Sequence, residues 1–464
     1  MHRHIRKRKE LLEFLCISLI VVLAFSIYEV KQFETPLLYG IDGPYYYVQI
    51  HSLIERGELK YPDPPLAFYI LYLFSIIFKD IILGIKIGSV LITLLTTYFV
   101  YYFVKSVGND RVGGIIAALI FTIYPSLGRL CFDFMKNAMG LLFLMMTIFF
   151  YYRSCKTERL KDIVLASISI ILTGLTHILD FAVAYGMVIF PALLYIAKGR
   201  ASKKLALPLI IGTILLALGF IYEPIMGGDP YKGISYLLSL VHSETTKIEI
   251  KQVRMPMRNP IHIGHRIGSL MIMVGLPLVI GVIGIIFAIK CLNGVERSFI
   301  FVLSFILTIL CLPINPIQFL MRFSLMSAIL IPPILGTIIG RVVDKSLKII
   351  IGMMIIAFII PQFIAQMNSI RPSITIEEYH EIARLVLNVP KYATFIVPDT
   401  KLRYWIETFD VNALKSPMEG GRPPYILVVE NDIFRRIPMP PGSKLIFYGR
   451  YIRAYVIQVR PIRR

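Results

Sequence analysis

Charged residues are scarce in this chain. They make up only 17% of its 464 residues, whereas 56% of the residues are hydrophobic and the mean hydropathy is +0.71. A soluble protein of this length has too little polar surface to cover so much apolar area. The composition therefore excludes a soluble globular protein and indicates a membrane protein with many spans.

Acidic residues are fewer than basic ones, and the net charge is +20. In a soluble domain that balance would indicate nucleic-acid binding. Here the basic residues fall in short loops between apolar runs, where Lys and Arg set the orientation of membrane spans. The sequence therefore predicts no nucleic-acid partner.

Cysteine is also rare, and the chain has no internal repeat and no low-complexity tract. The five cysteines show no metal-site spacing, and no two share one predicted exterior loop. A disulfide framework is therefore not expected.

Long apolar runs alternate with basic loops along most of the chain. The runs cover residues 11–28, 83–104, 112–127, 137–152, 162–176, 181–197, 204–222, 268–290, 298–313, 319–341 and 347–366. If the basic loops between them face the cytoplasm, the chain has about eleven spans, a cytoplasmic N-terminus and an exterior C-terminus. The first run lacks a small-residue cleavage site, so we interpret it as an uncleaved anchor.

One apolar run, 65–78, does not fit this series. It is shorter than the roughly twenty residues that a span needs. Counting it as a span would also invert every basic loop that follows. We therefore expect a helix that lies in, or dips into, the exterior leaflet.

The sequence predicts two domains. Residues 1–367 form an all-α membrane domain with exterior loops at about 29–82 and 223–266, the first holding a helix near 46–56. Residues 368–464 form a small exterior α/β domain. Its expected elements are a helix over 374–388 and strands over 393–397, 425–429, 444–448 and 454–459.

Polar residues gather at the predicted exterior ends of the spans. Asp42 follows the first span, in Gly40-Ile41-Asp42-Gly43-Pro44. Later turns and helix ends hold Asp133, Lys136, Asn137, His177, Asp180, Glu223 and Arg322, and the second exterior loop adds Arg254, Arg258, His262, His265 and Arg266. Because ionisable groups at membrane depth are costly, they generally face a cavity or one another. We therefore predict a polar site at the exterior surface.

Each of these residues also has a structural interpretation. Asp42, beside glycine and proline, suits a turn. Asp133 suits a helix cap that pairs with Lys136. The remaining alternatives are a structural hydrogen bond between His177 and Asp180, snorkelling of Arg322 to the headgroups, and a plain headgroup-facing basic loop at 254–266.

The order of these residues resembles that in the GT-C superfamily of polytopic glycosyltransferases, which includes protein O-mannosyltransferases, aminoarabinose transferases and oligosaccharyltransferase catalytic subunits. In that superfamily an Asp follows the first span, then come aromatic residues, a helix ending near a Gly, and a Pro-Pro-Leu segment. Here the matching residues are Asp42, Tyr45–Tyr47, Gly57, Pro64-Pro65-Leu66, a second acid at Asp133 and a late arginine at Arg322. The likeness covers roughly residues 11–230 and, more weakly, 315–340.

The resemblance implies transfer of a sugar from a polyprenyl-phosphate donor, such as a dolichyl phosphate, to a glycan, lipid or protein acceptor outside the cell membrane. Asp42 would be the general base, with Asp133 as the second catalytic acid. These two would also hold a divalent cation, Mg²⁺ or Mn²⁺, if one is needed. The donor phosphate would bind Arg322 and the Arg254, Arg258, His262, His265 and Arg266 cluster, and Lys136, Asn137, His177, Asp180 and Glu223 would support the acceptor or the structure.

One motif of the superfamily is missing, and two other functions are alternatives. The Trp-Trp-Asp motif of oligosaccharyltransferases is missing, because the only tryptophan is Trp405; glycosylation of Asn is therefore not expected. A transporter or flippase of lipid-linked or small-molecule substrates is the main alternative. Carriers, however, bind their substrate near the membrane midplane with buried charged residues, and the spans here contain almost no charged residue near the midplane apart from Lys86, near an exterior end. A surface binding module would explain the C-terminal domain but not the acidic residues at the predicted exterior ends of the spans.

Isoleucine-rich spans and lysine-rich loops favour a thermophilic archaeal source.

Overall fold

The computed structural model describes residues 2–197, 205–221, 261–315, 317–342, 344–419, 421, 423–431, 440 and 442–457. Side chains are described for the same residues except 2–7, 219–221, 261–273, 317–318 and 418. The chain forms two compact units. The helical unit comprises Met1–Lys31, Tyr61–Ala67 and Gly88–Ser369, and the mixed unit comprises Gln32–Lys60, Phe68–Ile87 and Ile370–Arg464.

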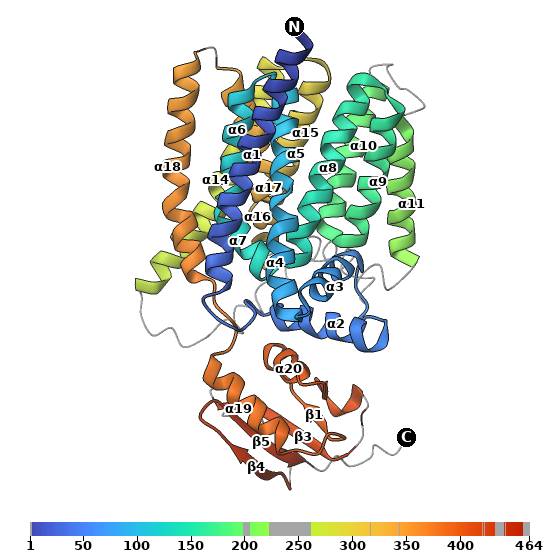
Figure 1. Ribbon diagram of the computed structural model, residues 1–464, viewed down its shortest axis with the longest axis vertical. Coiled ribbons are helices and arrows are strands. Elements are labelled where there is room, and N and C mark those ends of the chain that lie inside the picture. Colours follow the sequence, from blue (N-terminus) through green and yellow to red (C-terminus); the bar gives the residue numbers. More distant parts are fainter. Residues whose placement is uncertain are drawn as a thin grey trace. The chain divides into compact units, whose positions relative to one another are not determined.

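The helical unit consists of helices, the longer of which run roughly side by side (Figure 1). They are α1 (His2–Gln32), α5 (Thr96–Gly108), α6 (Arg111–Thr122), α7 (Pro125–Phe132), α8 (Met135–Thr157), α9 (Leu160–Thr176), α10 (Ile178–Ala197), α11 (Ala206–Ile221), α14 (Ile261–Cys291), α15 (Gly294–Leu310), α16 (Ile317–Leu325), α17 (Ser327–Gly340) and α18 (Lys345–Ser369). Two further helices, α3 (Leu66–Phe78) and α4 (Ile81–Leu94), belong in part to each unit.

The chain is a multi-pass membrane protein, as its composition predicts. Within the described residues, six helices are long and apolar enough to cross a membrane, and up to eight spans result if each of two bent pairs is one span. The count of eleven spans stays a prediction. Helices α9 and α15 have 17 residues each, or about 25 Å of helix, slightly less than the ~30 Å hydrocarbon core.

Two of the predicted continuous runs are broken. Helix α6 ends at Thr122, and α7 begins at Pro125 after a bend of 52°. A proline has no N–H to donate and disfavours helical geometry in the residue before it, and Tyr124 is indeed extended, with φ −65° and ψ 130°. Helices α16 and α17 bend by 44°. Each of the runs 112–127 and 319–341, predicted as one span, therefore contains a bend.

Small residues let α6 and α17 approach closely. A Cβ atom added at Gly113 would lie 2.4 Å from the carbonyl oxygen of Gly336, and one added at Gly336 would lie 2.6 Å from Cβ of Ala117. Such small-residue contacts are the usual basis of helix packing in membranes, where no hydrophobic driving force operates between helices.

The mixed unit contains a five-stranded sheet with two helices packed on it (Figure 1). Its strands are β1 (Thr394–Ile396), β2 (Asn412–Leu414), β3 (Tyr425–Glu430), β4 (Lys444–Tyr448) and β5 (Ile452–Ile457), in the order β2-β1-β3-β5-β4. Strand β1 is parallel to β2 and β3, whereas β5 is antiparallel to β3 and β4. The helices are α19 (Ile376–Leu387) and α20 (Thr400–Glu407). The predicted small α/β domain is confirmed.

Glu381 ties α19 to the β4–β5 hairpin. Its buried carboxylate accepts hydrogen bonds from the backbone N–H groups of Arg450, at 2.7 Å, and Tyr451, at 2.9 Å. Without these bonds, the backbone N–H groups of the turn would be buried with no hydrogen-bond acceptor.

Residues 32–60, which follow the first helix, belong to one unit with the C-terminal residues. Helix α2 (Gly43–Arg56) confirms the predicted helix near 46–56 and begins slightly earlier, with Pro44 in its first turn. Helix α3 has 13 residues, about 20 Å of helix, so it is too short to span. Its place in the exterior leaflet and the domain division at 367 and 368 stay predictions.

Candidate active site

The loop that carries Asp42 is held by its backbone. Gly40 adopts a left-handed φ of 69°, and its N–H donates to the carbonyl oxygen of Arg371 at 3.2 Å. A Cβ atom at Gly43 would lie 2.9 Å from Cβ of Leu38. Only glycine fits both positions without strain, so the sequence around Asp42 is adapted to one conformation.

Asp42 is the residue that precedes α2. Its backbone carbonyl accepts from Tyr46 N–H at 3.1 Å, but its carboxylate makes no capping hydrogen bond to the first turn. A carboxylate at this point is favoured by the partial positive charge of the helix N-terminus. Asp42 is half-buried at a position where the helix N-terminus favours a negative charge.

Lys86 anchors the start of the same loop. Its buried ammonium group donates to the carbonyl oxygens of Gln32, at 2.8 Å, and Thr35, at 2.6 Å. The sequence analysis predicted no role for this residue, because only the folded chain brings α4 beside the end of the first helix. Lys86 thus supports the segment that leads to Asp42.

Aromatic residues from α2 and α20 meet beside Asp42. The rings of Tyr45 and Tyr404 are 5.2 Å apart, measured between centroids. Burial raises the pKa of Tyr404, Arg403 opposes that rise, and the negative charge of Asp42 adds to it. The carboxylate of Asp42 is therefore close enough to act electrostatically on a residue of the C-terminal segment.

In the helical unit, the polar residues near the break between α7 and α8 form ion pairs. Lys136 pairs with Asp63, which comes from the proline-rich elbow before α3. Arg129 Nε lies 3.8 Å from a carboxylate oxygen of Asp133. Asp133 ends α7, and Phe134, rather than Asp133, precedes α8. The structure therefore places the second acid at a helix end without making it the N-cap.

His177 and Asp180 form a dyad in the turn between α9 and α10. Nδ1 of His177 lies 3.0 Å from Oδ2 of Asp180, whose side chain is fully buried. The predicted hydrogen bond between the two is confirmed. The other carboxylate oxygen of Asp180 and the amide oxygen of Asn137 are buried and accept no hydrogen bond within the described part of the chain. Buried acceptors normally have a hydrogen-bond partner, so a water molecule or a ligand hydroxyl is a suitable donor to each of these two oxygens.

Gly140 makes room for this dyad. A Cβ atom there would lie 2.1 Å from Oδ2 of Asp180. Because Asp180 is buried and bonded to His177, it has little freedom to move aside. We expect Gly140→Ala to destabilise the protein by about 1–3 kcal/mol through overpacking, measured as a lower Tm in detergent.

The matched control is Gly275→Ala in α14, where no atom of the described residues lies within 4 Å of the added Cβ atom. Alanine has the higher helix propensity, so this variant should keep or slightly raise the Tm. Equal Tm values for the two variants would contradict the packing of Asp180 against α8.

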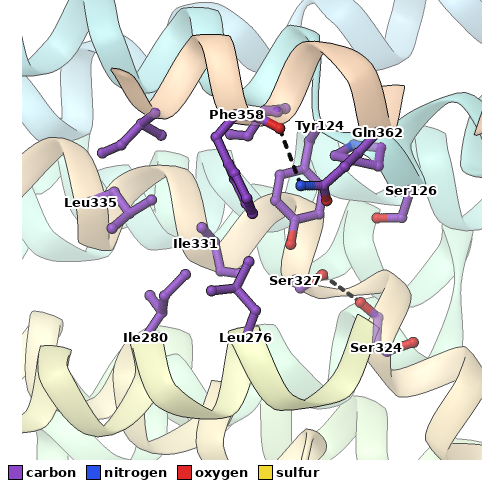
Figure 2. Close-up of a pocket in the computed structure, with 13 residues that line it drawn as sticks. Tyr124, Ser126, Leu276, Ile280, Ser324, Ser327, Ile331, Leu335, Phe358 and Gln362 are labelled. Carbon is purple, nitrogen blue, oxygen red and sulfur yellow. Dashed lines mark hydrogen bonds between the residues drawn. The ribbon is translucent and has the colours of Figure 1, made fainter. Parts of the chain in front are cut away.

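Arg322 lies in α16 with its side chain exposed, two residues before Ser324. Ser324 lines a cavity of about 190 Å³ between the α6–α7 break, α14, the α16–α17 bend and α18. Figure 2 shows apolar side chains toward one end and polar ones toward the other: Ile280, Ile331 and Leu335, then Ser126, Ser324 and Gln362. An amphipathic cavity therefore begins beside the arginine-bearing helix.

The predicted site residues are divided between the two units, and some lie outside the described residues. Glu223, Arg254 and Arg258 lie outside the described residues, and for His262, His265 and Arg266 only the backbone, in α14, is described. Asp42 belongs to the mixed unit, whereas Asp133, Lys136, Asn137, His177, Asp180 and Arg322 all belong to the helical unit. Among the described residues, no three His, Cys, Asp or Glu side chains cluster as a metal site.

Known proteins share this fold. The structure of the oligosaccharyltransferase from Archaeoglobus fulgidus in complex with Zn and sulfate matches with a TM-score of 0.59 and 14% identity, over 85% of this chain and 62% of that one. The same enzyme tethered to an acceptor peptide with the NVT sequon matches with a TM-score of 0.55 and 15% identity, over 86% and 63%. The chain thus spans less than two thirds of the oligosaccharyltransferase. It has the GT-C fold of polytopic glycosyltransferases, which confirms the predicted fold class.

A sequence comparison agrees with the fold. Residues 62–225 match the family described as dolichyl-phosphate-mannose-protein mannosyltransferase. A search of the curated proteins found no match. ArnT from Cupriavidus metallidurans bound to undecaprenyl phosphate is a more distant structural match, with a TM-score of 0.42 and 11% identity over 94% of this chain and 97% of that one. The matching family and the oligosaccharyltransferases are glycosyltransferases.

Proposed function

We propose that this protein transfers a sugar from a polyprenyl-phosphate donor to an acceptor at the exterior face of the membrane. The observation that carries the proposal is the placement of Asp42 on a backbone-constrained loop just after the first helix of a GT-C fold. The match of residues 62–225 to a family named for dolichyl-phosphate-mannose supports a lipid-linked donor.

In the proposed reaction the acceptor hydroxyl attacks the anomeric carbon of the donor. The hydroxyl proton passes to the carboxylate of Asp42, a new C–O bond forms, and the bond between the anomeric carbon and the phosphate oxygen breaks. The polyprenyl phosphate leaves with the electron pair of that bond. Asp133 orients the acceptor or holds a divalent cation.

The amphipathic cavity of the helical unit suits the donor lipid. Its apolar end matches an isoprenoid chain, and its polar end includes Ser324, which lies in the same short helix as Arg322. A guanidinium group can pair with two phosphate oxygens at once. We therefore assign the donor phosphate to Arg322 and the first part of its chain to the cavity.

The acceptor side is assigned to the residues near the start of α8. The buried acceptor oxygens of Asn137 and Asp180 suit donation from a hydroxyl-bearing ligand. His177, held at Nδ1 by Asp180, keeps its ring orientation when such a ligand binds.

The proposal requires the site to lie outside the cytoplasm. A basic N-terminus in the cytoplasm and eleven spans place residues 368–464 on the exterior side of the cell membrane. A reporter fused after Arg464 should therefore give an exterior signal, and a control fusion in the basic loop after Arg341 should give a cytoplasmic one. A cytoplasmic signal from the C-terminal fusion would overturn the eleven-span topology.

Turnover of lipid-linked sugars tests the function itself. Purified protein should consume one class of polyprenyl-phosphate sugar and release the polyprenyl phosphate in equal amount.

A further inference from the structure

A second cavity, of about 330 Å³, lies within the mixed unit. Its walls come from the loop before Asp42, from α2, from the start of α4, and from α19 and α20. Small-molecule sites measure about 300 to 1,000 Å³, so this cavity suits one small ring rather than a long chain. Segments that are far apart in the sequence therefore build one compact pocket.

Aromatic rings in fixed orientations line this pocket. Nε1 of Trp405 donates to the hydroxyl oxygen of Ser373 at 2.9 Å, which fixes the indole plane. Tyr379 packs edge-on against Trp405, with centroids 5.7 Å apart. Tyr47 stacks on His51 at 5.9 Å. The rings are therefore held in place before any ligand binds, which lowers the entropic cost of binding.

The polar groups of the pocket are uncharged hydroxyls and one imidazole. Burial raises the pKa of Tyr47 and of Tyr379, and the nearby phenol of Tyr379 raises that of Tyr47 further. Both tyrosines thus stay protonated and able to donate. Thr408 donates to the carbonyl oxygen of Trp405 at 2.7 Å and keeps lone pairs to accept. No Asp, Glu, Lys or Arg lines the pocket among the described residues.

We propose that this pocket binds a neutral sugar ring of the acceptor glycan. A pyranose has an apolar C–H face, which packs on aromatic rings, and a rim of hydroxyls, which pair with Tyr47, Tyr379 and Thr408. An isoprenoid chain would leave those hydroxyls unpaired, at a cost. A charged peptide would find no opposite charge. Assigning the sugar to the acceptor rests on the proposed function, whereas sugar binding itself does not.

The sequence provides its own reporter, because Trp405 is the only tryptophan in the chain. Tryptophan fluorescence of the purified full-length protein should change saturably with the methyl glycoside of mannose, glucose or galactose. Tyr47→Phe and Tyr379→Phe keep the rings and remove one hydroxyl each. Each should weaken binding of that glycoside about two- to tenfold. Tyr392→Ala, at a position that is 72% exposed and outside the pocket, should leave binding unchanged.

Three results would overturn the inference. They are no response to any of the glycosides, a response to farnesol in place of them, or wild-type affinity in both phenylalanine variants. The outcome is separable from the proposed function. Sugar binding without donor turnover would contradict the transferase proposal alone. Donor turnover without sugar binding, at an unchanged rate in both variants, would contradict the pocket alone.

Discussion

Replacing Asp42 by Asn should lower sugar transfer at least about a hundredfold, since general-base catalysis contributes roughly 10²–10⁴ in rate. Asparagine keeps the shape of the side chain but cannot take the proton of the acceptor hydroxyl. The loop is held by Lys86 and by the hydrogen bond between Gly40 and Arg371, so folding and expression should survive. The measurement is the initial rate of loss of lipid-linked sugar.

The matched control is Asp80→Asn, the same chemical change in the same unit. Asp80 is exposed and accepts from Leu83 N–H at 2.7 Å at the start of α4. Asparagine also caps helices well, so this variant should transfer at the wild-type rate. Near-native transfer by Asp42→Asn would make Asp42 a turn residue and remove the main support for the proposed mechanism.

Replacing Arg322 by Ala should lower turnover about 10²–10³-fold, the effect typical of losing one group that stabilises charge in a transition state. The leaving phosphate gains negative charge as the sugar departs, and the guanidinium would stabilise it. Lysine should restore only part of the rate, because it lacks the planar pair of donors. Initial rates for both variants provide the test.

Arg159→Ala is a suitable control for the loss of an exposed arginine, since Arg159 precedes α9 and is exposed in the helical unit. It should leave turnover unchanged. Full activity in both Arg322 variants would mean that this side chain only extends to the lipid headgroups.

Much of the fold was predictable because local patterns determine it. Short apolar runs separated by Pro and Gly turns predicted β1, β3, β4 and β5, and the amphipathic stretch after the last span predicted α19. The pattern missed α20 and β2. A helix of eight residues and a strand of three leave too short a periodic signal. Their positions come instead from the Asp399 cap and from pairing with β1.

The candidate site was only partly predictable, because local sequence patterns do not determine the contacts between distant segments. The turn between α9 and α10 is short enough that a bond between His177 and Asp180 follows from the sequence. The space that Gly140 leaves for the Asp180 side chain does not follow from the sequence, because it depends on how α8 packs against α10. The aromatic pocket likewise needs three separate segments, and no local pattern in the sequence predicted it.

Donor turnover tests the central claim most directly. Purified wild-type protein and Asp42→Asn should be incubated with a series of polyprenyl-phosphate sugars, and both lipid-linked sugar and free polyprenyl phosphate should be quantified. The proposed function predicts that the wild type consumes one donor with equal release of polyprenyl phosphate and that the variant consumes almost none. Movement of an intact lipid-linked sugar across a vesicle membrane, with no donor consumed, would contradict it and make the protein a carrier.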